Sequence, residues 1–177
     1  MSLQQKAARQ NGPAAFLVTK VVKKLKKQLT FYKNVVTIMH IRRQTSDIKK
    51  NKGAAYMYRS EEVRKLAPEM DPLRLGMGWK LSDLDKPKIM IESTMGDSHP
   101  GSAHLMEFVE QAAKGVQDAG GKAARYYTTD ICDGQAQGHD GINYSLASRD
   151  MIANMVEIHE SATPFDGGVF IASCDKG

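Results

Sequence analysis

Reactive side chains gather in three short polar stretches in the second half of the chain. The last stretch, Cys174-Asp175-Lys176, follows the apolar run 169–172 and places a thiol, a carboxylate and an amine side by side. A thiolate binds iron or zinc, a carboxylate oxygen binds magnesium, and an amine adds a positive charge or a modifiable group. A buried cysteine, a turn aspartate and a solvated lysine would give the same spacing, so the triplet alone leaves both interpretations open.

The two earlier stretches add imidazoles, carboxylates and a second thiol. Their polar residues are Asp97, Ser98, His99 and His104 in the first, and Asp130, Cys132, Asp133, Gln135, Gln137, His139 and Asp140 in the second. The glycine-rich segment 134–141 has backbone amides that can bind an anion, but it lacks the Gly-Lys-Ser/Thr of a P-loop, which argues against ATP chemistry. Two cysteines are too few for an ordinary four-thiolate electron-transfer cluster. Residue chemistry alone therefore indicates metal-assisted chemistry on a small polyoxygenated anion.

Apolar periodicity predicts the elements that carry these stretches. We expect strands at 88–91, at 124–128 and from Val169 onward. One helix should begin after Ser102 as its N-cap and end at Gly120-Gly121, and another should run from about 146 to 160. The first helix is expected to bury Leu105, Phe108, Val109, Ala112 and Val116 and to pair Glu110 with Lys114, and the second to turn Met151, Ile152, Met155, Val156 and His159 inward.

This strand–helix–strand–helix–strand order predicts an α/β fold with a parallel β-sheet and flanking helices. Each polar stretch follows a strand, and the carboxyl ends of parallel strands lie at one edge of the sheet. We therefore expect carboxylates, imidazoles and thiols from all three stretches to converge at that edge and to form a metal site.

Several of these segments also resemble a known family. They are Asp133-Gly134, Gly138-His139 and Gly141, Tyr144-Ser145-Leu146 with Ser148-Arg149, the segment Pro100 to Leu105, and Ser173-Cys174-Asp175-Lys176. In order and spacing they are similar to the blocks of the dihydroxy-acid dehydratase and phosphogluconate dehydratase family. The resemblance runs from about Pro87 to Gly177 and extends toward Met57.

The resemblance implies a hydro-lyase that converts 2,3-dihydroxy carboxylic acids into 2-keto acids. In this family an iron–sulfur cluster acts as Lewis acid on the leaving hydroxyl, and a divalent ion, usually Mg²⁺, holds the carboxylate end of the substrate. The substrate would be a branched-chain amino-acid precursor or, alternatively, a sugar acid such as gluconate, phosphogluconate or a pentonate. The family also implies a homodimer.

The resemblance assigns roles to individual residues. Cys174 would bind the iron–sulfur cluster, Asp133 and Asp175 would bind Mg²⁺, and Lys176 would be a catalytic residue that binds Mg²⁺ as a carbamate. Gly101 stands where members with a [2Fe–2S] cluster have cysteine, which favours [4Fe–4S]. Cys132 is interpreted as structural. Family members are several times longer and carry a further cluster cysteine, a metal-binding glutamate and a serine base in the remaining part, so we expect this chain to be an N-terminal fragment that is inactive alone.

The charge distribution divides the chain near Tyr56. Residues 1–55 hold 13 Lys or Arg residues and one acidic residue, which gives +12, whereas the remainder carries −7. We interpret residues 1–56 as a basic extension, partly helical or disordered, and residues 57–177 as the truncated dehydratase domain. Alternatively, residues 1–56 are translated leader ahead of Met57. The strand-like segment 31–41 has no obvious partner in sequence.

The basic segment allows a function of another class. Apolar residues at helical spacing between Ala14 and Leu29, with lysines mostly on the other side, are compatible with a non-enzymic protein that binds nucleic acid or an anionic membrane. No apolar run approaches the roughly 18 residues of a membrane span. The two cysteines do not form the framework of a secreted disulfide protein, and we therefore expect a reducing, cytoplasmic location.

Overall fold

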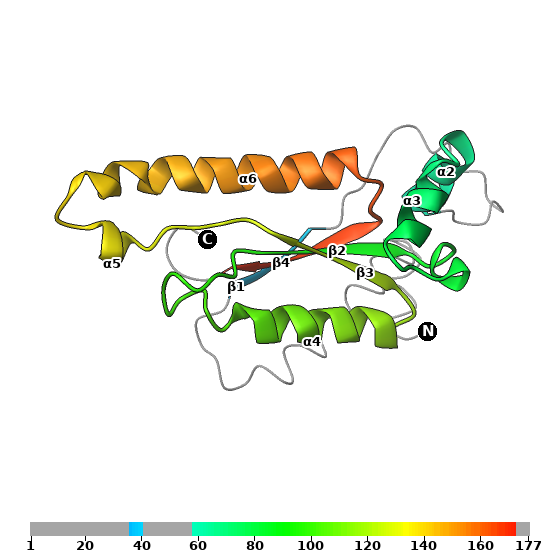
Figure 1. Ribbon diagram of the computed structural model, residues 1–177, viewed down its shortest axis with the longest axis horizontal. Coiled ribbons are helices and arrows are strands. Elements are labelled where there is room, and N and C mark those ends of the chain that lie inside the picture. The colour runs from blue at the N-terminus through cyan, green and yellow to red at the C-terminus, as the bar shows by residue number, and fades with distance from the viewer. Residues whose placement is uncertain (1–35, 41–57, 173–177) are drawn as a thin grey trace, which may run out of the picture.

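The structure is a computed structural model that describes residues 36–40 and 58–172 (Figure 1). Its centre is a four-stranded sheet with the strand order β1-β4-β2-β3. Strands β2 (Lys88–Ser93), β3 (Lys122–Tyr127) and β4 (Gly167–Ala172) are parallel, whereas β1 (Val36–His40) pairs antiparallel with β4. The predicted α/β fold with a parallel sheet is confirmed. Within the segment 31–41, residues 36–40 do have a partner, β4, and the other predictions for residues 1–56 lie outside the described residues.

Helix α4 (Leu105–Asp118) covers one face of the sheet and forms the core with it. The predicted apolar face is buried, and it packs against Ile89 and Ile91 of β2 and Val169 and Ile171 of β4. Every residue of β2 is buried, because parallel strands are covered on both faces. The helix ends at Asp118, and Gly120 shortly after it adopts a φ of 89° as helix-terminating glycines do.

Two local predictions for α4 were wrong. The helix begins later than expected, with His104 as N-cap, because the Ser102 hydroxyl donates to the Gly96 carbonyl at 2.8 Å and closes the preceding turn instead. Glu110 binds Arg125 of the neighbouring strand through two contacts of 2.8 Å rather than Lys114. The Arg125 guanidinium can bind both oxygens of the Glu110 carboxylate, which makes it a stronger partner than the single ammonium of Lys114.

Helix α6 (Ser145–Ala162) lies along the other side of the sheet, but much of it is exposed. Met151 is 61% exposed and Met155 is exposed as well, so the prediction that both turn inward was wrong, while Ile152, Val156 and His159 are half-buried. At 1.5 Å per residue an 18-residue helix is about 27 Å long, whereas a six-residue strand spans about 20 Å. Its N-terminal half therefore projects beyond the strands (Figure 1).

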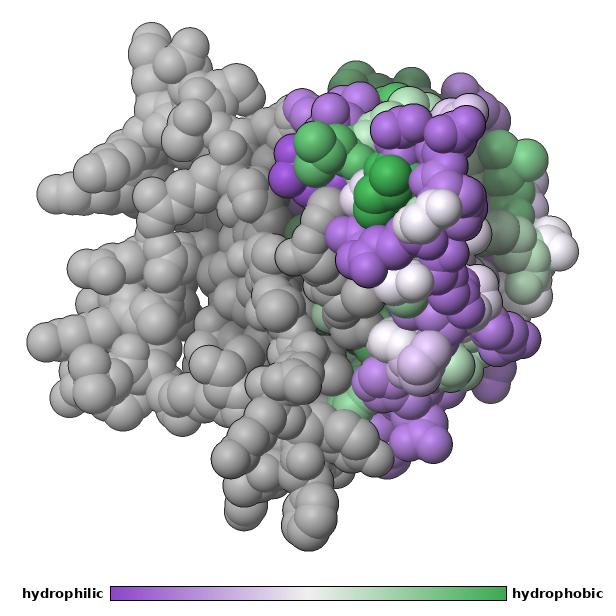
Figure 2. All heavy atoms as spheres, turned by 90° about the vertical axis from the view of Figure 1, so that its left-hand side faces the viewer, coloured by the Kyte–Doolittle hydropathy of each residue, from purple (hydrophilic) through white to green (hydrophobic). Residues whose placement is uncertain are grey.

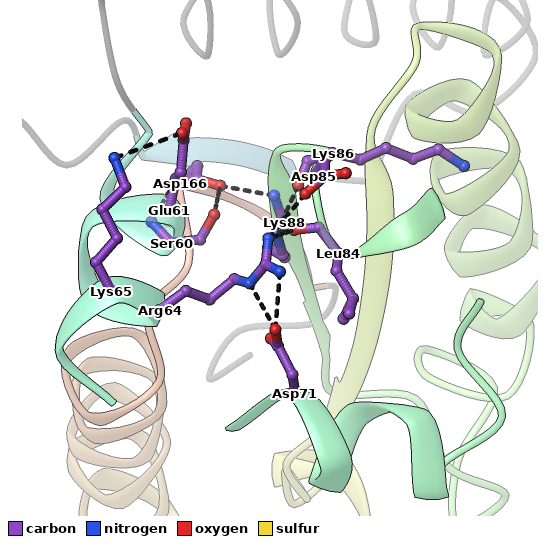
Figure 3. Close-up of polar contacts among 10 residues, drawn as sticks. All are labelled: Ser60, Glu61, Arg64, Lys65, Asp71, Leu84, Asp85, Lys86, Lys88 and Asp166. Atoms are coloured by element: carbon purple, nitrogen blue, oxygen red, sulfur yellow. Dashed lines mark hydrogen bonds and ion pairs between the residues drawn. The ribbon is translucent and has the colours of Figure 1, made fainter. Parts of the chain in front are cut away.

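Two short helices, α2 (Arg59–Leu66) and α3 (Met70–Gly76), and a 3₁₀ turn, η1 (Leu81–Asp83), close the amino end of the sheet. Asp166 ties α2 to the sheet by accepting hydrogen bonds from the backbone amides of Ser60 and Lys88 and from the Ser60 hydroxyl (Figure 3). Arg64 adds contacts to Asp71 and to the Leu84 carbonyl. None of the described helices is long and apolar enough to cross a membrane.

Candidate functional site at the carboxyl edge of the sheet

Two of the three polar stretches meet where the parallel strands end. The loop 94–104 follows β2, and the segment 128–144 follows β3. The first residue of each loop is hydrogen-bonded to a neighbouring strand. The Thr94 amide donates to the Ile171 carbonyl at 3.3 Å, and the Thr128 amide donates to the Ser93 carbonyl at 3.0 Å. The third stretch, with Cys174, Asp175 and Lys176, lies outside the described residues, so its predicted place at this edge stays a prediction.

A buried histidine–aspartate pair joins the two loops. His99 Nε2 lies 2.9 Å from Asp130 Oδ1, and the two side chains are 1% and 2% exposed. Gln135 adds a second connection by donating from Nε2 to the Ser98 carbonyl at 2.8 Å. The loops are therefore held together by a buried polar contact and by a more exposed one.

Asp133, the predicted magnesium ligand, begins a short helix between these contacts. The glycine-rich segment forms α5 (Asp133–Ala136) and the 3₁₀ helix η2 (Asp140–Tyr144), and Gly138, with a φ of 82°, separates them. Asp133 is half-buried, and its Oδ1 accepts a hydrogen bond of 2.6 Å from the hydroxyl of Ser145, the first residue of α6. An oriented carboxylate is the hard oxygen ligand that Mg²⁺ prefers.

One carboxylate does not make a metal site. Within residues 36–40 and 58–172, no group of three or more His, Cys, Asp or Glu side chains could hold a metal ion. A site at Asp133 would therefore need the predicted ligands Asp175 and Lys176. The donor types fit, since carboxylate and carbamate oxygens suit Mg²⁺ and the Cys174 thiolate suits iron.

The other candidate residues take local structural positions. His104 bonds the Pro100 carbonyl at 3.2 Å, and His139 accepts from the Gly141 amide at 3.0 Å. His99 and His104 thus have separate partners. Cys132 is a half-buried free thiol at the N-cap of α5, and its interpretation as structural stays a prediction.

Comparison with known proteins decides the family. The family model described as dihydroxy-acid/6-phosphogluconate dehydratase N-terminal matches residues 86–177, which are 92 of the 177 residues. The chain belongs to this family. The prediction from the motifs is thereby confirmed.

Individual relatives agree with the family match. The dihydroxy-acid dehydratase of Syntrophobacter fumaroxidans is 42% identical over 100 residues, 56% of this chain and 18% of the relative. That of Pyrococcus abyssi is 45% identical over 100 residues, with 56% and 18% covered, and that of Moorella thermoacetica is 41% identical over 110 residues, with 62% and 20% covered. The chain spans about a fifth of the length of these relatives.

The sequence reasoning missed a buried glutamate in this dehydratase segment. Glu92, near the end of β2, is 3% exposed, and its Oε2 lies 3.5 Å from Nδ1 of His159 on α6. Burial raises the pKa of Glu92, and His159 acts in the opposite direction. The available signal was an acidic residue inside a strand that is otherwise apolar just before its carboxyl end.

Buried polar atoms without hydrogen-bond partners also collect at this edge. Among the described residues they include Thr94 Oγ1, Thr128 Oγ1, His99 Nδ1 and Asp130 Oδ2. The side of the molecule that carries α5 and the start of α6 mixes hydrophilic residues with exposed hydrophobic ones such as Leu146 and Met151 (Figure 2).

Proposed function

We propose that this chain forms the N-terminal part of a hydro-lyase that removes water from a 2,3-dihydroxy carboxylic acid and yields a 2-keto acid. Family membership supports this, as do relatives named dihydroxy-acid dehydratase. Those names favour a branched-chain amino-acid precursor as substrate. A sugar acid is the alternative, because the family model also covers 6-phosphogluconate dehydratases. The proposal includes a homodimer in the cytoplasm.

In this proposal Asp133, Asp175 and the carbamate of Lys176 bind Mg²⁺, and Cys174 binds a [4Fe–4S] cluster. When bound, these groups supply Lewis-acid polarisation of the substrate's carboxylate and of its leaving hydroxyl. The described part of the chain holds the Asp133 carboxylate through the Ser145 hydroxyl at 2.6 Å. This oriented carboxylate, inside the family-matched segment and at the carboxyl edge of the sheet, is the observation that carries the proposal.

Metal titration tests the role of Asp133. We expect the metal-free chain to bind Mn²⁺, measured by the loss of the free-ion electron paramagnetic resonance signal, and Asp133→Asn to weaken this binding at least about tenfold. Asp140→Asn is the matched control, since Asp140 is an exposed carboxylate of the same segment. Equal binding by the two variants, or no binding by the wild type, would refute a magnesium site at Asp133.

Anaerobic titration with Fe²⁺ tests the role of Cys174 separately. Cys174→Ser should weaken iron binding, whereas Cys132→Ser should not, because only Cys174 is proposed as a ligand. The reverse result would exchange the roles of the two cysteines.

A further inference from the structure

We infer that Ser98 and His99 form a bracket that positions Asp133 as a metal ligand, an inference that rests on the proposed function. These adjacent residues of the loop after β2 contact the segment after β3 at two points. His99 binds Asp130, three residues before Asp133, and the Ser98 carbonyl binds Gln135, two residues after it. Asp133 thus lies between two anchored positions of its own segment.

The bracket itself is anchored. The His99 carbonyl accepts hydrogen bonds from the amides of Ser102 and Ala103 at 3.2 and 3.1 Å, and the Ser102 hydroxyl closes the turn onto Gly96. This turn leads directly into α4, which packs on the sheet. The position of the bracket is therefore fixed relative to the carboxyl edge.

The two contacts of the bracket differ in strength. The His99–Asp130 pair is almost fully buried, so removing one partner leaves the other without solvent or a hydrogen bond. The Gln135 side chain is exposed, so water can replace its contact with the Ser98 carbonyl. We expect His99 to contribute most of the positioning and Gln135 a smaller part.

The bracket and Ser145 restrain different parts of Asp133. The bracket fixes the backbone on either side, whereas the Ser145 hydroxyl fixes the direction of the carboxylate. Metal ligands need placement to within about 0.5 Å, and loss of an outer supporting contact typically lowers metal affinity 10–100-fold. His99, Asp130 and Gln135 are accordingly positioning residues that do not themselves touch the ion.

The experiment uses the full chain and two measurements. His99→Phe removes the buried contact, His99→Gln keeps an N–H donor, and Gln135→Ala removes the exposed contact. Gln137→Ala is the matched control, because Gln137 is an exposed glutamine two residues further along. Residue-resolved hydrogen exchange of the amides of Gln135, Ala136 and Gln137 in metal-free protein reports on the segment, and Mn²⁺ titration reports on the ligand.

We expect His99→Phe to speed exchange of these amides and to weaken Mn²⁺ binding, each about tenfold, with partial rescue in His99→Gln. Gln135→Ala should weaken Mn²⁺ binding about threefold, and Gln137→Ala should match the wild type. If the amides of His99→Phe exchange at the wild-type rate, the positioning role of the bracket is refuted, whatever the Mn²⁺ result. The role is also refuted if exchange becomes faster but Mn²⁺ affinity is unchanged. Failure of Asp133→Asn to weaken Mn²⁺ binding would instead refute the proposed metal site, which keeps the two failures distinct.

Discussion

Replacing Asp166 should destabilise the domain more than any exposed carboxylate of the same region. Its carboxylate accepts three hydrogen bonds, from the Ser60 amide at 2.9 Å, the Ser60 hydroxyl at 2.7 Å and the Lys88 amide at 2.7 Å (Figure 3). Asp166 is 9% exposed, so water cannot easily replace it. One side chain thereby connects α2, the start of β2 and the start of β4.

The magnitude follows from these contacts. At about 1 kcal/mol for each hydrogen bond, Asp166→Ala should lower the free energy of unfolding by about 3 kcal/mol, a large share of the roughly 5–15 kcal/mol of a typical domain. Asp166→Asn keeps one acceptor oxygen and should lose about half as much. Asp85→Ala is the matched control, because Asp85 pairs with Arg64 at 2.9 Å but its side chain is 83% exposed. An exposed pair of this kind contributes at most about 1 kcal/mol.

Urea denaturation followed by circular dichroism measures all three variants against the wild type. The expected order of stability loss is Asp166→Ala, then Asp166→Asn, then Asp85→Ala. Equal losses for Asp166→Ala and Asp85→Ala would show that the network in Figure 3 does not hold α2 on the sheet.

Three further predictions concern pH and activity. Burial raises the pKa of Glu92 above its usual 4.5. The free energy of unfolding should therefore fall as the pH rises from about 4.5 through that raised pKa, because the folded state binds the proton more tightly. Urea denaturation of Glu92→Gln at several pH values should show a smaller fall than the wild type. Burial lowers the pKa of Lys88 to about 8, so the free energy of unfolding should rise between about pH 8 and 10.5, and an equal rise in Lys88→Met would contradict this assignment. The purified chain should form no 2-keto acid from a branched-chain 2,3-dihydroxy acid or 6-phosphogluconate in a coupled assay, because it spans only about a fifth of the length of its dehydratase relatives; a measurable rate would refute this expectation.

The sequence predicted the elements whose apolar pattern is decided by packing. The face of α4 was predicted residue by residue, because the helix lies on the buried apolar residues of β2 and β4. The same reasoning failed for Met151 and Met155 of α6, since periodicity identifies an apolar face but not whether a sheet extends beneath it. The antiparallel place of β1 was also beyond reach, because strand pairing across more than a hundred residues leaves no local signal.

The candidate site was predictable in position but not in its contacts. Alternating strands and helices placed two polar loops at one edge, and the structure confirms that arrangement. The pairing of His99 with Asp130 was not predicted, because neither the 31-residue separation nor the residue types indicate it. Glu92 was missed for a related reason: a charge in a buried strand is explained only by its partner on α6.

Both ends of the sheet contain buried polar groups, and at each end some of them lack hydrogen-bond partners among the described residues. At the amino end, Asp166 and Arg64 bond backbone and side-chain groups of α2, β2 and the turns between them. At the carboxyl end, Thr94 and Thr128 keep buried hydroxyls without hydrogen-bond partners among the described residues. Buried polar groups are almost always paired in native proteins, so we expect groups outside the described residues, or bound water or ligand, to complete this edge. Asp71 Oδ1 and Arg74 Nη1 lack partners near the amino end as well, so unpaired atoms alone do not distinguish the carboxyl edge, and the family match to residues 86–177 is what favours a site there.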